Sequence, residues 1–245
     1  MGAPHRPTRP EPDRPAPAPG PFERAADAAR DGLHALKPRL RGWLHTGMAP
    51  VVLAGGVVLV VLAPSPLARL AAVIYAITSL LLFTVSAVYH RGRWSPRVLA
   101  VLRRLDHSNI FLIIAGTYTP IALLAMQGGP RIAVLVVVWT GAVLGVVFRI
   151  FWLSAPRWLY TPLYVGLGWV AVFVLPQILG GGGTAALVLV LAGGLAYTLG
   201  GLVYALKRPR LNPHWFGFHE VFHALTVVGY TAQYIAVSFV TYRVA

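Results

Sequence analysis

Long apolar stretches separated by short breaks constrain the fold of this chain more than any other feature. A helix that crosses a bilayer needs about 20 mostly apolar residues. Proline and glycine, which end helices and form turns, fill several of the breaks, as in residues 64–66 and 180–183. The pattern predicts an all-α, polytopic membrane protein, folded as a bundle of seven transmembrane helices. The seven stretches are residues 43–63, 70–89, 106–126, 132–148, 159–179, 184–206 and 219–240.

The composition supports a membrane protein and excludes several other classes. Only 11% of the residues are charged, whereas an ordinary soluble domain carries about 25%. The 21 Lys and Arg residues greatly outnumber the 7 Asp and Glu residues. They interrupt apolar runs instead of covering a polar fold, so no nucleic-acid partner is expected. Because the chain has no cysteine, any metal must be held by His, Asp or Glu.

Two parts of different character make up the chain. Residues 1–42 begin with a stretch rich in proline and charge, which predicts a disordered tail. A weakly amphipathic segment follows, which could lie as a helix on the membrane surface. No apolar core typical of a secretory signal peptide follows the first basic residues. Residues 43–245 are predicted to form the seven-helix membrane domain.

The distribution of basic residues predicts the orientation in the membrane. Lys and Arg gather in the cytoplasmic connections of membrane proteins. When the seven stretches alternate in direction, 18 of the 21 basic residues fall on the side of the N-terminus. We therefore expect a cytoplasmic N-terminus and an outer C-terminus in the cytoplasmic (inner) membrane. In the second connection, Ser95 and Pro96 favour the start of a short interfacial helix before the third span.

Polar side chains gather at the cytoplasmic ends of three stretches: His90 ends the second, Asp106 opens the third, and His219 and His223 open the seventh. His219 and His223 are four residues apart, so their imidazoles share one helix face. Together with His90 they would supply three zinc ligands and leave the fourth position to water, as in catalytic zinc sites. Asp106 would hold or deprotonate this water. Ser86, one turn before His90, would hydrogen-bond the water or a developing oxyanion.

Each of these residues also has a simpler explanation. Ser86 could bond to the carbonyl one turn earlier, and Asp106 could interact with its helix N-terminus. Taken singly, His45, His107 and His214 are expected to be interfacial residues. Ionisable groups in membrane segments are costly, however, and usually mark function. The joint occurrence of several such groups at one depth therefore favours a site.

A second interpretation comes from residues 219–223, which read HEVFH. They match the HExxH pattern of zinc metalloproteases, in which the glutamate is the general base. The chain would then be an intramembrane protease. Such proteases usually take a further carboxylate ligand from a later helix, and no Asp or Glu follows Glu220. Glu220 also lies off the face shared by the two histidines, so we expect it to interact with Lys207, Arg208 or Arg210.

Three segments resemble the motif regions of the hemolysin III family, the bacterial branch of the progestin and adipoQ receptor (PAQR) family. They are SAVYH at 86–90, LDHSNIFLIIAGTYTP at 105–120 and HEVFHALTVVG at 219–229. The resemblance implies seven helices, a cytoplasmic N-terminus and zinc near the cytoplasmic face. It also implies that His90, His219 and His223 are the ligands, that Asp106 contacts the zinc water and that Ser86 is the motif serine.

The leading functional hypothesis is a zinc-dependent hydrolase that cleaves an amide or ester bond in a membrane lipid. A different class of function stays open: a receptor-like or membrane-homeostasis protein without enzymatic activity, in which zinc is structural. Cytolysis is suggested by the family name alone. Membrane lipids are the expected partners. Gly141 and Gly145 form a GxxxG pattern that can support helix association, and the oligomeric state stays open.

Overall fold

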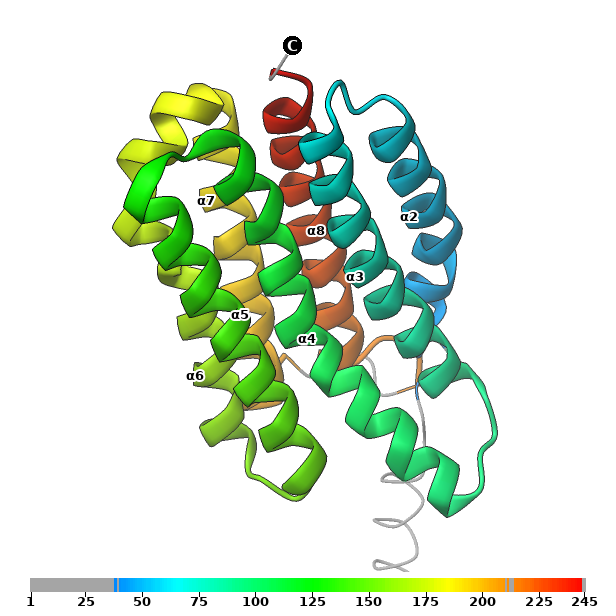
Figure 1. Ribbon diagram of the computed structural model, residues 1–245. Coiled ribbons are helices and arrows are strands. Elements are labelled where there is room, and N and C mark those ends of the chain that lie inside the picture. The colour runs from blue at the N-terminus through cyan, green and yellow to red at the C-terminus, as the bar shows by residue number, and fades with distance from the viewer. Residues whose placement is uncertain (1–37, 39, 210, 212–213, 244–245) are drawn as a thin grey trace, which may run out of the picture. The chain divides into compact units, whose positions relative to one another are not determined.

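The computed structural model describes residues 38, 40–209, 211 and 214–243. This part of the chain is all-helical (Figure 1). The expected tail and surface helix, residues 1–42, lie almost wholly outside the described residues. The elements are α2 (Trp43–Val61), α3 (Pro66–Arg91), α4 (Pro96–Ala125), α5 (Gly128–Phe151), α6 (Arg157–Gly168), the 3-10 helix η1 (Trp169–Val174), α7 (Leu175–Leu206) and α8 (Phe218–Tyr242).

Six helical stretches of the described chain are long and apolar enough to cross a membrane. Five of them are α2, α3, α4, α5 and α8. The sixth runs from Arg157 to Leu206 and joins α6, η1 and α7 in 50 residues. A straight helix of that length would measure about 75 Å, more than twice the roughly 30 Å hydrocarbon core of a bilayer.

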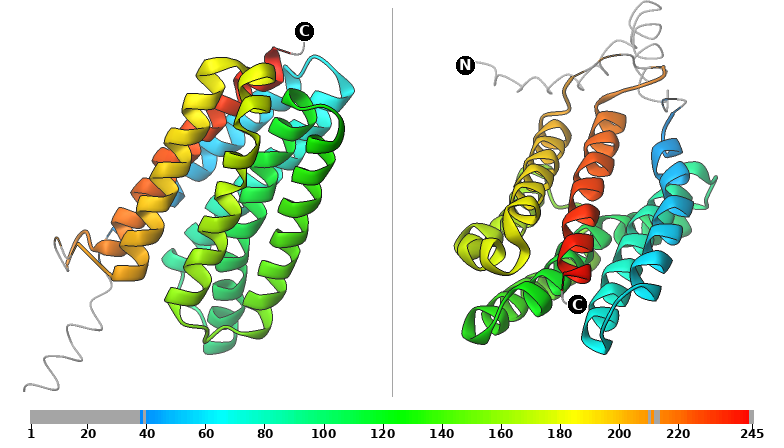
Figure 2. Two further views of the ribbon diagram at one scale, coloured as in Figure 1. Left: turned by 90° about the vertical axis from the view of Figure 1, so that its left-hand side faces the viewer. Right: turned by 90° about the horizontal axis from the view of Figure 1, so that it is seen from above.

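This long stretch folds back on itself. Gly183 has φ 80° and ψ 173° inside α7, a backbone conformation outside the helical region that glycine adopts readily. Two hydrogen bonds join the segment before Gly183 to the segment after it. Trp169 donates to Thr198 at 2.9 Å, and Arg157 donates to the Tyr204 carbonyl at 3.3 Å. α6 and most of α7 therefore run antiparallel, with the turn at one end of the bundle (Figure 2, left).

Helix α4 joins the expected short interfacial helix and the third span in one continuous helix. It is one helix of 30 residues from Pro96 to Ala125, about 45 Å long. Ser95 and Pro96 do begin it, although the Ser95 side chain makes no capping hydrogen bond. No proline or glycine interrupts residues 97–115, so nothing separates the amphipathic first turns from the apolar remainder. Asp106 consequently lies within a continuous helix.

Close packing of α3 against α4 depends on Gly116. A Cβ atom added there would lie 2.0 Å from Thr78 Oγ1. The two glycines of the GxxxG pattern on α5 also contact neighbouring helices of the same chain. A Cβ atom added at Gly141 would meet Leu167, and one added at Gly145 would meet the Phe111 ring. The GxxxG pattern is thus used to bring α5 against α6 and α4.

We expect Gly116→Ala to destabilise the bundle by about 1–3 kcal/mol, because the methyl group overpacks the α3–α4 contact. Gly194→Ala on α7 is the matched control, since an added Cβ there has no neighbour within 4 Å. Thermal unfolding of the purified protein in detergent checks the difference. Equal melting temperatures for the two variants would contradict the packing account.

Candidate metal centre

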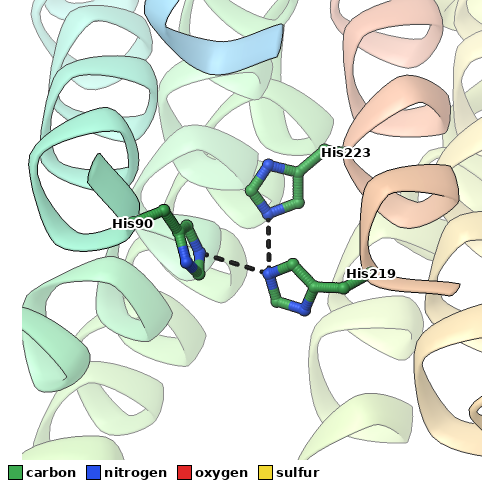
Figure 3. A group of neighbouring side chains, drawn as sticks. All are labelled: His90, His219 and His223. Carbon is green, nitrogen blue, oxygen red and sulfur yellow. Dashed lines mark hydrogen bonds between the residues drawn. The ribbon is translucent and has the colours of Figure 1, made fainter. Parts of the chain in front are cut away.

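Three histidines from two helices meet at one end of the bundle (Figure 3). His90 lies in the last turn of α3, and His219 and His223 lie in the first two turns of α8. His219 Nε2 is 3.2 Å from His90 Nε2 and 3.0 Å from His223 Nε2. One ring nitrogen from each residue lies within 4.8 Å of the other two. This group could hold a metal ion.

Two local features bring the histidines together. The spacing of four residues places His219 and His223 on one face of α8. On the other side, Gly42 precedes α2 with φ 80°, and a Cβ atom there would lie 2.7 Å from His90 Cβ. Glycine is thus required both by the left-handed backbone and by the close approach of His90.

His45 is a fourth histidine at the cluster that the sequence analysis missed. It is 2% exposed, and its ring stacks on that of His223 with centroids 3.9 Å apart and an angle of 20°. Phe83 meets it edge-on at 4.9 Å. The prediction of an interfacial His45 is therefore wrong. A signal existed, because His45 begins the first apolar stretch and so lies at the same depth as the other three.

Asp106 and Ser86 lie beside the cluster. Asp106 Oδ2 is 3.9 Å from His90 Nε2, beyond hydrogen-bond length but within reach through one water. The Ser86 hydroxyl is buried and interacts with the Asp106 carboxylate. The structure thus brings together all five residues singled out from the sequence. The roles expected for Asp106 and Ser86 stay predictions.

Glu220 has a different partner from those expected. It is 2% exposed and accepts a hydrogen bond of 2.7 Å from Arg41 Nε, while its second oxygen accepts one of 2.8 Å from the Gly217 amide. Neither Lys207 nor Arg208 is among the partners of this carboxylate, and Arg210 lies outside the described residues, so an interaction with it stays a prediction. Both oxygens serve an ion pair and a helix N-terminus, which argues against Glu220 as the general base of a protease.

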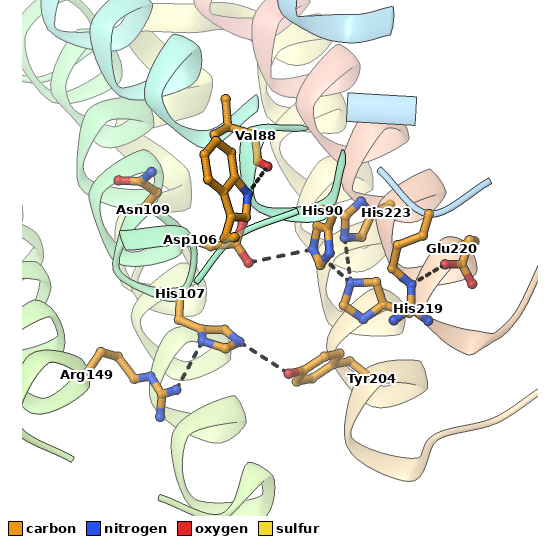
Figure 4. Close-up of polar contacts among 12 residues, drawn as sticks. Val88, His90, Asp106, His107, Asn109, Arg149, Tyr204, His219, Glu220 and His223 are labelled. Carbon is orange, nitrogen blue, oxygen red and sulfur yellow. Dashed lines mark hydrogen bonds and ion pairs between the residues drawn. The ribbon is translucent and has the colours of Figure 1, made fainter. Parts of the chain in front are cut away.

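A second polar network lies beside Asp106 and joins α4, α5 and α7 (Figure 4). His107 Nδ1 is 3.1 Å from Arg149 Nη2, and His107 Nε2 is 3.4 Å from the Tyr204 hydroxyl. Arg149 is only 1% exposed. The expectation of an interfacial His107 is wrong, because its ring is held inside the bundle by these contacts. The expected end of the fourth stretch at residue 148 is also wrong, because the contacts of Arg149 allow α5 to continue beyond it.

A cavity of about 120 Å³ connects the two polar groups with the apolar interior. Near the histidine cluster it is lined by His45, Asp106 and His219, and its far end reaches Ile121 and Gln233. Asp106 and Ile121 are 15 residues apart on α4, about 22 Å along the helix axis. Most of its other lining residues are apolar. The histidine cluster thus opens onto an elongated apolar space.

The sequence model of one protein family, described as haemolysin-III related, matches residues 33–234. This match covers most of the chain and every residue of the histidine cluster. The chain belongs to the haemolysin-III-related family. The family is part of the PAQR group, as the three motif segments predicted. Together with its apolar helices, this membership makes the chain a multi-pass membrane protein.

Two curated relatives carry haemolysin names. This haemolysin-III-related chain is 29% identical over 171 residues to the hemolysin-3 homolog of Bacillus subtilis, covering 70% of this chain and 77% of the relative. It is 31% identical over 169 residues to hemolysin-3 of Bacillus cereus, covering 68% of this chain and 73% of the relative. The likeness extends over most of the membrane domain in each case.

Proposed function

We propose that this protein is a zinc-dependent hydrolase that cleaves an amide or ester bond of a lipid at the cytoplasmic face of the inner membrane. The observation that carries the proposal is a cluster of three histidine nitrogens beside a carboxylate, with His219, His223 and Asp106 lining an apolar cavity. Polar chemistry beside an apolar space suits a substrate with a reactive headgroup and an apolar chain.

The donor set fits zinc. Imidazole nitrogens are common zinc ligands, with Zn–N distances of roughly 2.0–2.1 Å. Tetrahedral ligands at that distance lie about 3.3 Å apart, close to the contacts of 3.0 and 3.2 Å between the histidine nitrogens. Three protein ligands leave one coordination position open, as in catalytic sites. Without cysteine, the chain offers no competing thiolate ligands.

The chain's own residues take complementary parts in this proposal. Zinc, when bound, polarises a carbonyl and lowers the pKa of a bound water to about 7. Asp106, 3.9 Å from His90, orients this water and accepts its proton as general base. Ser86 interacts with the Asp106 carboxylate and fixes its position. The apolar cavity walls hold the lipid chain and keep bulk water away from the reacting bond.

The structure also supports a membrane topology with seven crossings. The fold-back at Gly183 divides the stretch Arg157–Leu206 into two antiparallel arms, which we propose are separate crossings. With the basic residues placed inside, the N-terminus is cytoplasmic, the C-terminus is outside, and the histidine cluster lies at the cytoplasmic end.

Cysteine labelling tests this topology without background, because the natural chain has no cysteine. In intact cells, a membrane-impermeant maleimide should label Ser65→Cys and Arg243→Cys, which lie at the outer end in the proposal. Trp94→Cys and Ser154→Cys should react only after the cells are opened. Labelling of Trp94→Cys in intact cells would contradict the orientation, and protection of Arg243→Cys would contradict the odd number of crossings.

A second candidate function has one observation in its favour. His90 lies on α3 and the other two histidines lie on α8, so a metal here would also join two helices. In a membrane-homeostasis sensor or receptor-like protein, the zinc would be structural and would hold these two helices together. Lipid profiles of a deletion strain complemented with wild type or with Asp106→Asn separate the two. The hydrolase predicts that only wild type restores the profile, whereas a structural zinc predicts that both do.

A further inference from the structure

A short segment before α2 connects the two helices that supply the histidine cluster. Residues 40–43, which we call the strap, form a turn in which the Trp43 amide donates to the Leu40 carbonyl at 3.1 Å. At the end of α3, the Arg91 guanidinium lies 4.0 Å from the centre of the Trp43 ring. Just before α8, the Trp215 carbonyl accepts a hydrogen bond of 3.4 Å from the Leu40 amide. The strap therefore bridges the two helix ends that carry the cluster.

Gly42 brings the strap against the cluster itself. This glycine is buried, and a Cβ atom added to it would lie 2.7 Å from His90 Cβ. Two residues beyond the strap, the His45 ring stacks on that of His223. The strap touches His90 through carbon and not through a ring nitrogen. It thus lies next to the cluster without using the atoms that could bind a metal.

An ion pair ties the strap to α8. Arg41 Nε donates to Glu220 Oε1 at 2.7 Å, and the side chains of the two residues are 24% and 2% exposed. Hydrogen bonds between charged groups are stronger than those between neutral groups, and a buried carboxylate is costly without its counter-charge. By comparison, the backbone hydrogen bond to Trp215 is long and the stacking on Trp43 is exposed. The ion pair is therefore the main tie between the strap and α8.

We propose that the strap is a gate for the metal. While the ion pair between Arg41 and Glu220 is closed, residues 40–43 cover the histidine cluster, and when it opens the metal exchanges with solvent. The glutamate of the HExxH pattern then controls access to the metal centre. Because the strap does not use the metal-binding nitrogens, it closes equally well over an empty and an occupied cluster. It therefore sets the rates of metal uptake and release and leaves the affinity unchanged.

The exchange of zinc by the full-length protein in nanodiscs tests this gate. Release from zinc-loaded protein to excess chelator is followed by stopped-flow absorbance, and uptake by the chelator-treated protein is followed with a fluorescent zinc indicator. Arg41→Gln and Glu220→Gln should each accelerate both processes by roughly tenfold to a hundredfold, the usual contribution of a hydrogen bond to a charged group. The dissociation constant for zinc should stay that of wild type.

These two variants also separate a gate from a simple effect of charge. Arg41→Gln removes a positive charge near the cluster, and Glu220→Gln removes a negative one. An effect of charge alone would change the rate of zinc uptake in opposite directions, whereas an open strap accelerates uptake in both variants. The glutamine at position 220 also keeps a carbonyl oxygen for the Gly217 amide, which Glu220 accepts at 2.8 Å.

Arg131→Gln is the matched control. It makes the same chemical change at the opposite end of α4, where Arg131 donates to the Met126 carbonyl at 2.8 Å, so its rates should match wild type. Arg41→Lys keeps the positive charge and should exchange zinc more slowly than Arg41→Gln.

Several results would overturn the gate. They are wild-type rates in both Arg41→Gln and Glu220→Gln, opposite changes of uptake in the two variants, or weaker zinc affinity with unchanged uptake. The proposal rests on the metal centre of the proposed function and not on hydrolysis. Absence of zinc binding by wild type would refute both the metal centre and the gate. Faster exchange in the two variants without any lipid hydrolysis by wild type would refute the hydrolase alone.

Discussion

Replacing His219 and His223 with alanine should abolish metal binding by the purified protein. The double variant removes two of the three ring nitrogens that lie within 4.8 Å of one another, and one histidine on α3 cannot hold zinc alone. We expect zinc content to fall from about one ion per chain to nearly none. Inductively coupled plasma mass spectrometry after dialysis against zinc-free buffer measures this loss directly.

His214→Ala is the control for that experiment. His214 is an exposed histidine in the connection before α8 and lies outside the cluster. The zinc content of the His214→Ala protein should therefore match that of wild type. Circular dichroism of the double variant should still report a helical protein, because the bundle packs along the whole length of α8. Equal zinc content in wild type and the double variant would refute the metal centre.

The second large effect concerns Asp106→Asn. This change keeps the size and polarity of the side chain but removes the negative charge that, in the proposed mechanism, accepts a proton. Asp106 lies 3.9 Å from His90 and does not belong to the group of three histidines that could hold the metal. We therefore expect the variant to retain its zinc. Lipid hydrolysis should fall by about 10²- to 10⁴-fold, the usual contribution of a general base.

Ser86→Ala gives an informative comparison with Asp106→Asn. In the proposed mechanism Ser86 positions the carboxylate without accepting the proton, so its loss should reduce the rate by less than the loss of Asp106. Initial rates at matched zinc content provide the measurement. Full activity in Asp106→Asn would show that another group takes the proton, and loss of zinc in that variant would instead make Asp106 part of the metal site.

Local patterns in the sequence predicted the apolar helices and the histidine trio well. The positions of His219 and His223 follow from helix periodicity, and His90 follows from the alternation of spans, which puts it at the same depth. The same argument places His45 at the depth of the cluster, because it begins the first apolar stretch. The fold-back between α6 and α7 was visible as the glycine run at 180–183.

Features that depend on packing between distant helices could not be read from the sequence. The pairing of Glu220 with Arg41 needs the start of α2 to lie beside the start of α8. The network of Arg149, His107 and Tyr204 needs α4, α5 and α7 in their final positions. By sequence alone, a buried arginine looks like the end of an apolar stretch, because its hydrogen-bond partners come from other helices.

Release of fatty acid from a lipid extract by the purified protein tests the central claim most directly. Three samples are compared: the zinc-loaded wild type, the same protein after chelation, and zinc-loaded Asp106→Asn. Mass spectrometry of the products should show fatty acid release, with loss of a parent amide or ester lipid, in the first sample alone. Equal release in all three, or no release by zinc-loaded wild type from the cell's own lipids, would contradict the proposed hydrolase.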